Sequence, residues 1–314
     1  MDILHQTKQP GVIVPTDLKS CYDRICHNVA SLNMQRIGLA ESKIQCMFQP
    51  LPHLEHSICC AFGTSRETYG NELNSTPMQG VYQGNGAGPV IWAVVSSPLL
   101  QILKEDGYGT YFRTTLSDKP ICIVGYAFVD DTDLIQTADS DDTYSDVHHK
   151  MQDAMDLWEG LIKNTGGALA VIKCRWWGID FQWNHGKWSY RNKHDFQQEL
   201  FAIDTSGKRQ KIKQLDVSDA YKTLGVFIAV DGNHREQLKI MKEQARDWAD
   251  RLRTSFLSKN EAVQALHSTI LKKLEYPLLP MSLSREECDS ILQPIFQATL
   301  PKARINRNFN GTFE

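Results

Sequence analysis

Two aspartates that follow each other directly, Asp130 and Asp131, carry the clearest chemical signal in this sequence. Neighbouring carboxylates repel each other, so an isolated turn avoids such a pair unless water or a cation offsets the repulsion. A third aspartate, Asp17, ends the short apolar run GVIVPTD. Carboxylates that converge from separate elements can hold two metal ions about 3.5–4 Å apart, an arrangement that catalyses phosphoryl transfer. The alternative is an exposed acidic turn, and an Asp-Asp pair alone is a weak signal.

The residues around the three aspartates predict the elements that position them. The run GVIVPTDL is short, apolar and β-branched, which predicts a buried strand ending at Asp17. The segments ICIVGYAFV and DLIQTA predict the two strands of a hairpin with the acids in its turn. A helix is expected to begin at Asp142 or Thr143 and to stop at Gly166-Gly167. A strand-end aspartate that faces a hairpin-tip pair supplies the convergence that two-metal chemistry needs.

The rest of the chain divides into a β-rich and a helical part. Helical spacing is expected over residues 22–32, and short strands are expected between about residues 174 and 230. From residue 232 onward the apolar spacing predicts long helices, and Ser258 with Glu261 forms a capping-box signature. The sequence therefore predicts an α+β fold, in which a short antiparallel sheet backed by helices is followed by a helical region.

Five segments in order strengthen the signal: TDLKSCYDRI, VYQGNGAGP, YAFVDDTD, GGALAVIKC and YKTLGV. They resemble motifs A, B, C, D and E of reverse transcriptases, closest to those of non-LTR retrotransposons, and with the intervening chain they cover about residues 12 to 230. The helical tail resembles the thumb of these enzymes less specifically. The resemblance implies an RNA-directed DNA polymerase, with a polymerase palm in residues 1–231 and a thumb-like region in residues 232–314.

The resemblance also implies the metal ligands and the partners. In that family the first motif A aspartate and the motif C aspartate pair hold the metals, which correspond here to Asp17, Asp130 and Asp131. Two Mg²⁺ ions are the expected cofactors, with Mn²⁺ as the alternative ion. The implied partners are an RNA template, a DNA primer and deoxynucleoside triphosphates.

Motifs A and B add candidates for nucleotide selection. Tyr22 stands where the family places an aromatic ring under the sugar, which would clash with a 2′ hydroxyl and select deoxyribonucleotides. Its alternative is a core tyrosine. Gln83 and Gly84 resemble the pair that lines the templating base and the incoming nucleotide. The segment 79–80 has the same letters, but the Gly-Ala-Gly-Pro that follows the second pair favours Gln83-Gly84.

Motifs D and E add candidates that contact the triphosphate and the primer. Lys173 corresponds to the motif D lysine, which in the family lies near the triphosphate and can protonate the leaving pyrophosphate. Its alternative is a surface lysine. Leu224-Gly225 resembles the primer-grip turn, where glycine permits a tight bend.

The charge distribution is compatible with a nucleic-acid partner although the net charge is −3. Residues 129–160 contain ten acids against Lys150 alone, whereas residues 172–213 contain nine Lys or Arg against four acids. Such a division can attract cations at one place and a phosphate backbone at another. A solvated surface of mixed charge is the alternative. Four tryptophans could stack bases, although aromatic clusters in short β-ribbons are more often packing: Trp176, Trp177, Trp183 and Trp188.

Several classes of protein are excluded by composition. Apolar runs stay below the roughly 18 residues that a membrane span needs, and the N-terminal segment MDILHQTKQPG does not resemble a signal peptide. The eight cysteines are scattered, without CxxC or zinc-ligand spacing, which argues against a disulfide framework or a structural zinc site. We expect a soluble, intracellular protein without a membrane partner.

Three functions remain open from the sequence. Asp17 stands close to the first residue, so the fingers that carry the family's triphosphate-binding basic residues are expected to be missing or truncated. The chain is expected to extend primers barely or not at all until fingers are restored. Besides a polymerase, it could be a catalytically inactive nucleic-acid-binding remnant of a mobile element. It could also be a two-metal phosphodiesterase, which would need a histidine or a further acid near the metals. His148 and His149 are the nearest in sequence, but they are expected to face solvent.

Overall fold

The structure is a computed structural model, and it describes residues 2–68, 80–81, 84–114, 117–139 and 141–305. The chain forms two compact units, Met1–Asp216 and Val217–Glu314. The boundary between these units lies upstream of the boundary near residue 232 predicted from the sequence. As functional domains, the ranges 1–231 and 232–314 stay a prediction.

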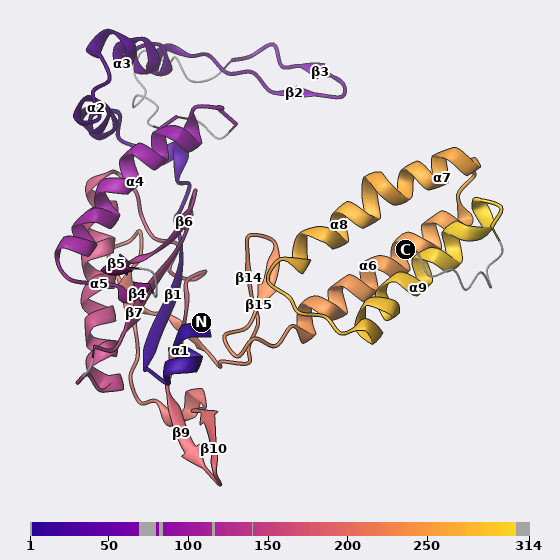
Figure 1. The fold of residues 1–314 in the computed structure, drawn as a ribbon. Helices are drawn as coiled ribbons and strands as arrows, with labels where there is room; N and C mark the ends of the chain where they lie inside the picture. Colours follow the sequence, from indigo (N-terminus) through magenta and orange to yellow (C-terminus); the bar gives the residue numbers. More distant parts are fainter. Residues whose placement is uncertain (1, 69–79, 82–83, 115–116, 140, 306–314) are drawn as a thin grey trace. The chain divides into compact units, whose positions relative to one another are not determined.

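A five-stranded sheet forms the centre of the first unit. Its strands are β1 (Gly11–Asp17), β6 (Gly125–Phe128), β7 (Asp131–Thr137), β8 (Arg175–Ile179) and β13 (Lys213–Leu215). Their order is β13-β8-β1-β7-β6, and Figure 1 labels β1, β6 and β7 of this sheet. Strand β1 pairs antiparallel with both β7 and β8, and β6 pairs antiparallel with β7, but β13 runs parallel to β8. The sheet is therefore mixed, and the prediction of an antiparallel sheet is corrected at this edge.

The parallel edge results from the long connection between β8 and β13. This connection contains two hairpins, formed by β9 (Phe181–Asn184) with β10 (Lys187–Tyr190) and by β11 (Phe201–Ile203) with β12 (Arg209–Lys211). A connection of a dozen or more residues can return the chain to the sheet in its original direction, which a tight turn cannot do.

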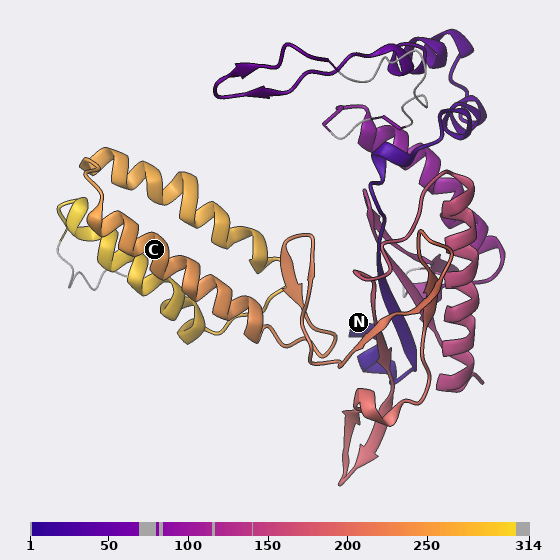
Figure 2. The ribbon, with the colours of Figure 1, turned by 180° about the vertical axis from the view of Figure 1, so that it is seen from behind.

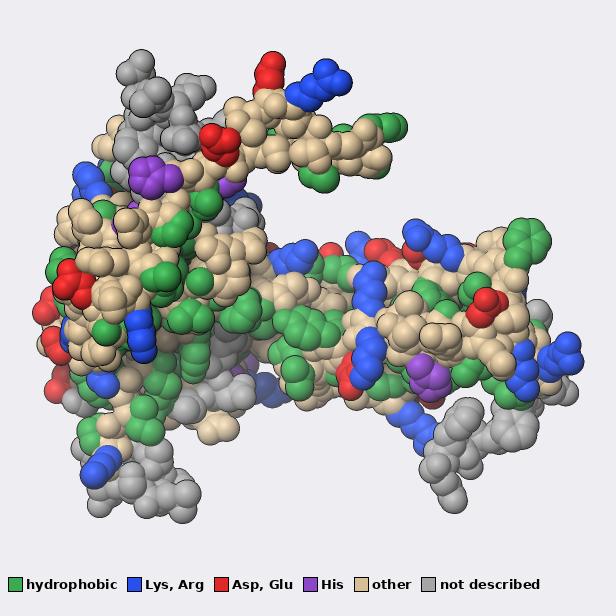
Figure 3. All heavy atoms as spheres, turned by 90° about the horizontal axis from the view of Figure 1, so that it is seen from above, with side chains coloured by type: hydrophobic (Ala, Val, Ile, Leu, Met, Phe, Trp, Pro, Cys, Tyr) green, Lys and Arg blue, Asp and Glu red, His purple; other side chains and the backbone are tan. Residues whose placement is uncertain are grey.

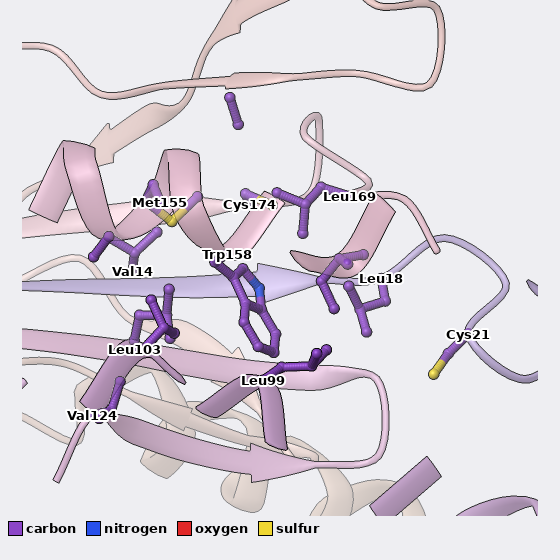
Figure 4. Close-up of a cluster of buried hydrophobic side chains, with 14 of the residues drawn as sticks. Val14, Leu18, Cys21, Leu99, Leu103, Val124, Met155, Trp158, Leu169 and Cys174 are labelled. Carbon is purple, nitrogen blue, oxygen red and sulfur yellow. The ribbon is translucent and has the colours of Figure 1, made fainter. Parts of the chain in front are cut away.

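Two long helices lie on one side of the sheet, as Figures 1 and 2 show: α4 (Gly88–Glu105) and α5 (Tyr144–Asn164). Helix α5 begins where the sequence predicts, with the side chain of Asp146 accepting a hydrogen bond from the backbone N–H of the N-cap residue Thr143 at 2.9 Å. Apolar side chains from the sheet and both helices meet in a buried core (Figure 4), among them Val14, Leu99, Leu103, Met155 and Trp158.

The predicted strand ICIVGYAFV is two strands in the structure. Its first part belongs to β5 (Ser117–Ile123), which pairs with β4 (Thr110–Thr114), and its second part is β6. Gly125 begins β6 so close to β7 that a Cβ atom built there would lie 2.4 Å from the carbonyl oxygen of Asp133. The chain therefore changes partners at Val124, between two strands that a continuous apolar run does not distinguish.

The remaining elements of the first unit are short. They are α1 (Asp2–Thr7), α2 (His27–Arg36), α3 (Glu41–Phe48), β2 (Cys59–Cys60), β3 (Gly63–Thr64) and the 3₁₀ turns Tyr22–Arg24, Leu51–His53 and Lys193–Asp195. The helix predicted from the spacing over residues 22–32 is confirmed only in part. The regular helix starts only at His27, and Leu32 of the predicted apolar stripe is exposed.

The second unit consists of a small hairpin and a helical bundle. The hairpin is β14 (Tyr221–Thr223) with β15 (Val226–Ile228), and the helices are α6 (Arg235–Thr254), α7 (Lys259–Ala265), α8 (Leu271–Glu275) and α9 (Arg285–Lys302). The predicted capping box of α7 forms, since the backbone N–H of Ser258 donates to a carboxylate oxygen of Glu261 at 2.8 Å. Several Lys and Arg side chains of this unit are visible on the face in Figure 3.

None of the helices within the described ranges combines the length and the apolar character that crossing a membrane requires.

Candidate active site at the end of the central sheet

The three predicted aspartates lie at the same end of the sheet. Asp17 is the last residue of β1 and is the direct antiparallel partner of Asp131, the first residue of β7. Asp131 also pairs with Phe128 across the β6-β7 hairpin, so Val129 and Asp130 form a two-residue turn. The strand end and the hairpin tip therefore meet as the sequence predicts, although they are more than a hundred residues apart.

The turn that carries Asp130 is strained. Val129 has a φ of 58°. This left-handed conformation is unfavourable for a β-branched residue and persists only where the surrounding structure imposes it. Here the pairing of Phe128 with Asp131 imposes it, because a two-residue hairpin loop needs a positive φ to match the twist of its strands. The same pairing keeps Asp130 at the tip, next to Asp131.

A cationic side chain contacts the first aspartate. The backbone N–H of Ala170 donates to the carbonyl oxygen of Asp17 at 2.8 Å, which holds the segment after Gly167 beside β1. From this segment the Nζ atom of Lys173 reaches both carboxylate oxygens of Asp17, at 3.1 and 3.2 Å. The side chain of Asp17 is 17% exposed and that of Lys173 is 64% exposed. The structure thus brings the predicted motif D lysine to the predicted aspartates.

Negative charge exceeds positive charge at this end of the sheet. Burial raises the pKa of Asp131, and the neighbouring carboxylates of Asp130 and Asp17 raise it further, while Lys173 lowers it. Among the charged groups that shift the pKa of Asp131, Lys173 is thus set against the carboxylates of Asp130 and Asp17. An excess of carboxylate oxygens is the environment that hard divalent cations such as Mg²⁺ prefer.

The carboxylates are not gathered around one point as they stand. Within residues 2–68, 80–81, 84–114, 117–139 and 141–305, no group of three or more His, Cys, Asp and Glu side chains is arranged to hold a metal ion. The amino group of Lys173 instead occupies both oxygens of Asp17. The charge and the oxygen donors fit Mg²⁺, and the role of the three aspartates as ligands is taken up below as a proposal.

A fourth acid at this site is absent from the sequence-based prediction. Asp133 lies two residues after Asp131 and so projects from the same face of β7. Burial, and then the charge of Asp131, raise the pKa of Asp133 to about 6. Asp133 lines a largely apolar cavity of about 380 Å³ together with Ile13, Tyr126 and Ile135. The alternation of acids in the segment DDTDL was the available signal for it.

Tyr22, in the motif A segment, contacts the motif B segment. Its carbonyl oxygen accepts a hydrogen bond from the backbone N–H of Val81 at 2.8 Å. Its ring packs against the first turn of α4, where a Cβ atom on Gly88 would lie 3.4 Å from the ring. Tyr22 is partly buried against the core, so it has a packing role in addition to the predicted contact with the sugar.

Of the predicted motif B pair, Gln83 lies outside the described residues. Gly84 is exposed, and a Cβ atom built on it would meet nothing within 4 Å. In contrast, Gly80 contacts motif A so closely that a Cβ atom would lie 2.3 Å from the carbonyl oxygen of Tyr22. The structure therefore gives Gly80 a packing role that the sequence did not indicate, and the nucleotide-binding role of Gln83-Gly84 stays a prediction.

The predicted primer-grip residues lie in the second unit. Leu224 and Gly225 form the two-residue turn between β14 and β15, with φ values of 50° and 87°. The hydroxyl of Tyr276 donates to the carbonyl oxygen of Leu224 at 2.8 Å and steadies this turn. A tight bend therefore exists here, and its contact with a primer stays a prediction.

His148 and His149, the two histidines considered for a phosphodiesterase, differ in their exposure to solvent. His149 is exposed as expected, but the expectation that His148 faces solvent is wrong, because His148 is only 5% exposed. It packs on α5 against Tyr144 and Trp176, with ring centroids 6.4 and 5.5 Å away. This position in the core gives His148 no access to a phosphate.

Comparison with known proteins gives distant structural similarity only. No protein-family model matches the chain, and no curated protein matches it. Among solved structures, the chain is similar to telomerase from Candida albicans in complex with the TWJ fragment of telomeric RNA. The TM-score is 0.37 and the sequence identity is 13%, and the match covers 99% of this chain and 46% of that chain. The chain is also similar to apo telomerase from Candida tropicalis, with a TM-score of 0.36, 14% identity and coverage of 97% and 49%. The chain thus spans about half the length of these proteins, and similarity at this level assigns no activity to it.

Proposed function

We propose that the chain is the palm and thumb portion of an RNA-directed DNA polymerase of the reverse transcriptase type, from a non-LTR retrotransposon. The observation that carries the proposal is the direct pairing of Asp17 with Asp131, with Asp130 in the adjoining strained turn. The order of the motifs A to E along the sequence supports it independently. In this proposal residues 1–231 form the palm and residues 232–314 act as the thumb.

The three aspartates are the proposed ligands of two Mg²⁺ ions, with Mn²⁺ as a substitute. When bound, such ions activate the 3′ hydroxyl of a primer and offset the charge that develops on the leaving pyrophosphate. Asp17 and Asp131 come from two strands that are already paired, and Asp130 comes from the adjoining turn, so little rearrangement of the backbone is needed to bring their oxygens together. Burial and then the neighbouring carboxylates raise the pKa of Asp131, and a divalent cation would relieve the repulsion between these carboxylates.

Lys173 is proposed to leave the carboxylate of Asp17 and to contact the triphosphate when a nucleotide binds. Its side chain is largely exposed, and its contact with Asp17 is an ion pair of the kind that contributes little to stability. A triphosphate at this end of the sheet would attract the ammonium group away from the carboxylate. From there the lysine can donate a proton to the leaving pyrophosphate.

The remaining predicted residues take their proposed roles from the same motifs. Tyr22, held against α4 by its packing on Gly88, would stand under the sugar of the incoming deoxynucleotide. Gln83 and Gly84 would line the base pair, and the Leu224-Gly225 turn would contact the primer. The RNA template, the DNA primer and the deoxynucleoside triphosphates are the proposed partners.

A catalytically inactive, nucleic-acid-binding remnant is the second candidate. The ion pair between Lys173 and Asp17 favours it, because a lysine that keeps its contact with a metal ligand would exclude the ion. A phosphodiesterase is less well supported. His148, one of the two histidines that follow the Asp130-Asp131 pair most closely in sequence, is enclosed in the core.

The test is extension of a DNA primer on an RNA template with deoxynucleotides and Mg²⁺. The 314-residue chain is compared with a version that carries an upstream fingers segment, and each is tested with Asp130→Asn and Asp131→Asn. Asp153→Asn, an exposed aspartate on α5, is the matched control. Extension that is lost in the first two variants and kept in the control supports the polymerase. Template binding that survives these substitutions, without extension in either version, supports the remnant. Strand cleavage without nucleotides would point to a phosphodiesterase.

A further inference from the structure

The β9-β10 hairpin carries two exposed tryptophans at a distance from the aspartates. Gly11, at the start of β1, pairs with Ile179 at the end of β8, and the hairpin begins two residues later. It therefore leaves the sheet at the end opposite to Asp17, as Figure 1 shows. The seven residues of β1 separate the two ends by roughly 20 Å at the usual rise of a strand. The hairpin cannot touch a nucleotide that reacts at the aspartates.

The two indole rings form one compact aromatic surface. Trp183 and Trp188 are direct cross-strand partners, with ring centroids 5.3 Å apart and planes at 72°. Their exposed fractions are 59% and 51%, whereas Trp176 and Trp177 in the sheet are buried. Of the four tryptophans that the sequence offered for stacking, the structure thus leaves this pair available.

The hairpin is held firmly at its base and turns tightly at its tip. At the base, the rings of Phe181 and Tyr190 lie 4.8 Å apart, and the ring of His5 from α1 stacks on Tyr190 at 5.7 Å. At the tip, His185 and Gly186 have φ values of 49° and 79°, the conformation of a tight two-residue hairpin turn. A preorganised aromatic pair loses little conformational entropy when it binds a ligand.

One exposed lysine stands beside the pair in sequence. Residues 180–195 contain Lys187, Arg191 and Lys193 against Asp180 and Asp195. Arg191 is paired with Asp180 at 2.8 Å, whereas the exposed Lys187 directly precedes Trp188, so its long side chain starts from the opposite face of the ribbon and meets a bound strand at the ribbon's edge. Exposed aromatic rings next to lysine are the combination by which proteins bind single-stranded nucleic acid, with the rings stacking on bases and the cations following the phosphates.

The size of the apolar surface argues against a protein partner. Two half-exposed indoles offer roughly 250 Å². A stable protein interface buries about 800 Å² on each partner. The neighbouring exposed positions of the ribbon, Asn184 and Ser189, are polar and do not enlarge the apolar area. The surface matches one or two bases and is too small for a protein.

We infer that Trp183 and Trp188, with Lys187, form a binding site for single-stranded nucleic acid that is separate from the aspartate site. The inference rests on the proposed function only in its choice of a nucleic-acid ligand. The site holds an unpaired stretch of template, or another single strand, away from the reacting end of the sheet. RNA and DNA share the stacking and phosphate chemistry that this surface recognises.

The test measures the affinity of the full chain for fluorescein-labelled 12-nucleotide oligo(U) and oligo(dT) by fluorescence anisotropy. The double substitution Trp183→Ala and Trp188→Ala is expected to weaken binding of both probes about tenfold or more. The double substitution to Phe keeps two stacking rings and should restore most of the affinity. Lys187→Ala should lower the slope of log affinity against log salt by about 0.7. Preference for one probe decides between RNA and DNA.

Phe62→Ala, which removes a fully exposed aromatic ring from another hairpin, is the matched control and should change little. Thermal unfolding by circular dichroism checks that the variants are folded. Binding by the double alanine variant within twofold of the parent chain would overturn the inference, and so would alanine and phenylalanine variants that behave alike. Asp130→Asn leaves this site intact, so tryptophan-dependent binding without primer extension supports the hairpin site while it refutes the polymerase. Primer extension without tryptophan-dependent binding would support the polymerase and refute the hairpin site.

Discussion

The ammonium nitrogen of Lys173 lies 3.1 Å from one carboxylate oxygen of Asp17 and 3.2 Å from the other. The two residues are 156 positions apart in the sequence. They meet because the backbone of Ala170 is hydrogen-bonded to that of Asp17, which places the following turn over the end of β1. The lysine therefore competes for the carboxylate that is proposed to bind a metal ion. Because of this competition, removal of the lysine is expected to strengthen the binding of the ion and not to weaken it.

Lys173→Ala is expected to tighten Mn²⁺ binding several-fold in the absence of nucleotide, because it removes a cation from a group of carboxylates. The same substitution should lower primer extension, since the triphosphate loses its proposed lysine. Lys173→Arg, which keeps the charge, is the control for ion binding. The measurement is electron paramagnetic resonance of free Mn²⁺ at low salt. Weaker Mn²⁺ binding in the alanine variant would contradict the competition.

Asp131→Asn is expected to stabilise the metal-free chain while it abolishes extension. Burial and the charges of Asp130 and Asp17 raise the pKa of Asp131, so its ionised form is destabilised in the fold. The gain should stay below about 1 kcal/mol, because solvent screens these partly exposed groups. Urea unfolding without and with Mg²⁺ measures it, with Asp153→Asn as the control. Mg²⁺ should stabilise the parent chain and not the Asp131→Asn variant. Equal stabilisation of both by Mg²⁺ would place the ion elsewhere.

Gly80→Ala and Gly84→Ala are expected to differ although both glycines have a positive φ, of 86° and 99°. At Gly80 the new Cβ atom would lie 2.3 Å from a backbone oxygen of Tyr22, so the chain must shift and should lose several kcal/mol of stability. At Gly84 the space is open, and only backbone strain of about 1 kcal/mol is expected. Urea unfolding of both variants checks the difference. A similar loss at both positions would show that Gly80 does not pack on motif A.

Acid should destabilise the chain through His148. Burial, and then the charge of His149, lower the pKa of His148 to about 4, from about 6.5 in the unfolded chain. Between these values the unfolded chain binds a proton that the folded chain does not. The contribution of His148 is therefore fully present above pH 6.5 and is lost as the pH falls towards 4, by about 2 to 3 kcal/mol. His148→Phe should make the free energy of unfolding less sensitive to pH in this window. His267→Phe, at an exposed histidine of the second unit, is the control. Equal slopes in the parent chain and His148→Phe would refute the assignment.

Tyr22→Ala, in a version that carries fingers, is expected to raise ribonucleotide incorporation more than it lowers deoxyribonucleotide use. The reason is the loss of the ring that would clash with a 2′ hydroxyl. Tyr22→Phe keeps the ring and should keep the selectivity. Single-nucleotide incorporation with each substrate provides the measurement. An equal loss on both substrates would assign Tyr22 to packing against α4 alone.

The sequence by itself determined the elements that depend on local pattern. The β-branched run that ends at Asp17 forms β1, the acids of the DDT segment stand at a hairpin tip, and Thr143 begins α5. Each of these follows from side-chain alternation, turn chemistry or capping over a few residues. The convergence of Asp17 with the hairpin could also be anticipated, because both positions lie at the ends of strands that belong to one sheet.

Some residues have the same type and similar neighbours in the sequence but different surroundings in the fold, and only the tertiary structure decided these surroundings. Two glycines preceded by glutamine differ in that Gly80 packs against Tyr22, whereas Gly84 is open to solvent. Neighbouring histidines differ in that His148 is buried and His149 is exposed. The parallel pairing of β13 with β8 and the ion pair of Lys173 with Asp17 join parts of the chain that are distant in sequence. Local patterns do not encode such contacts, because their free energy comes from loop closure and from burial against residues that only the complete fold brings together.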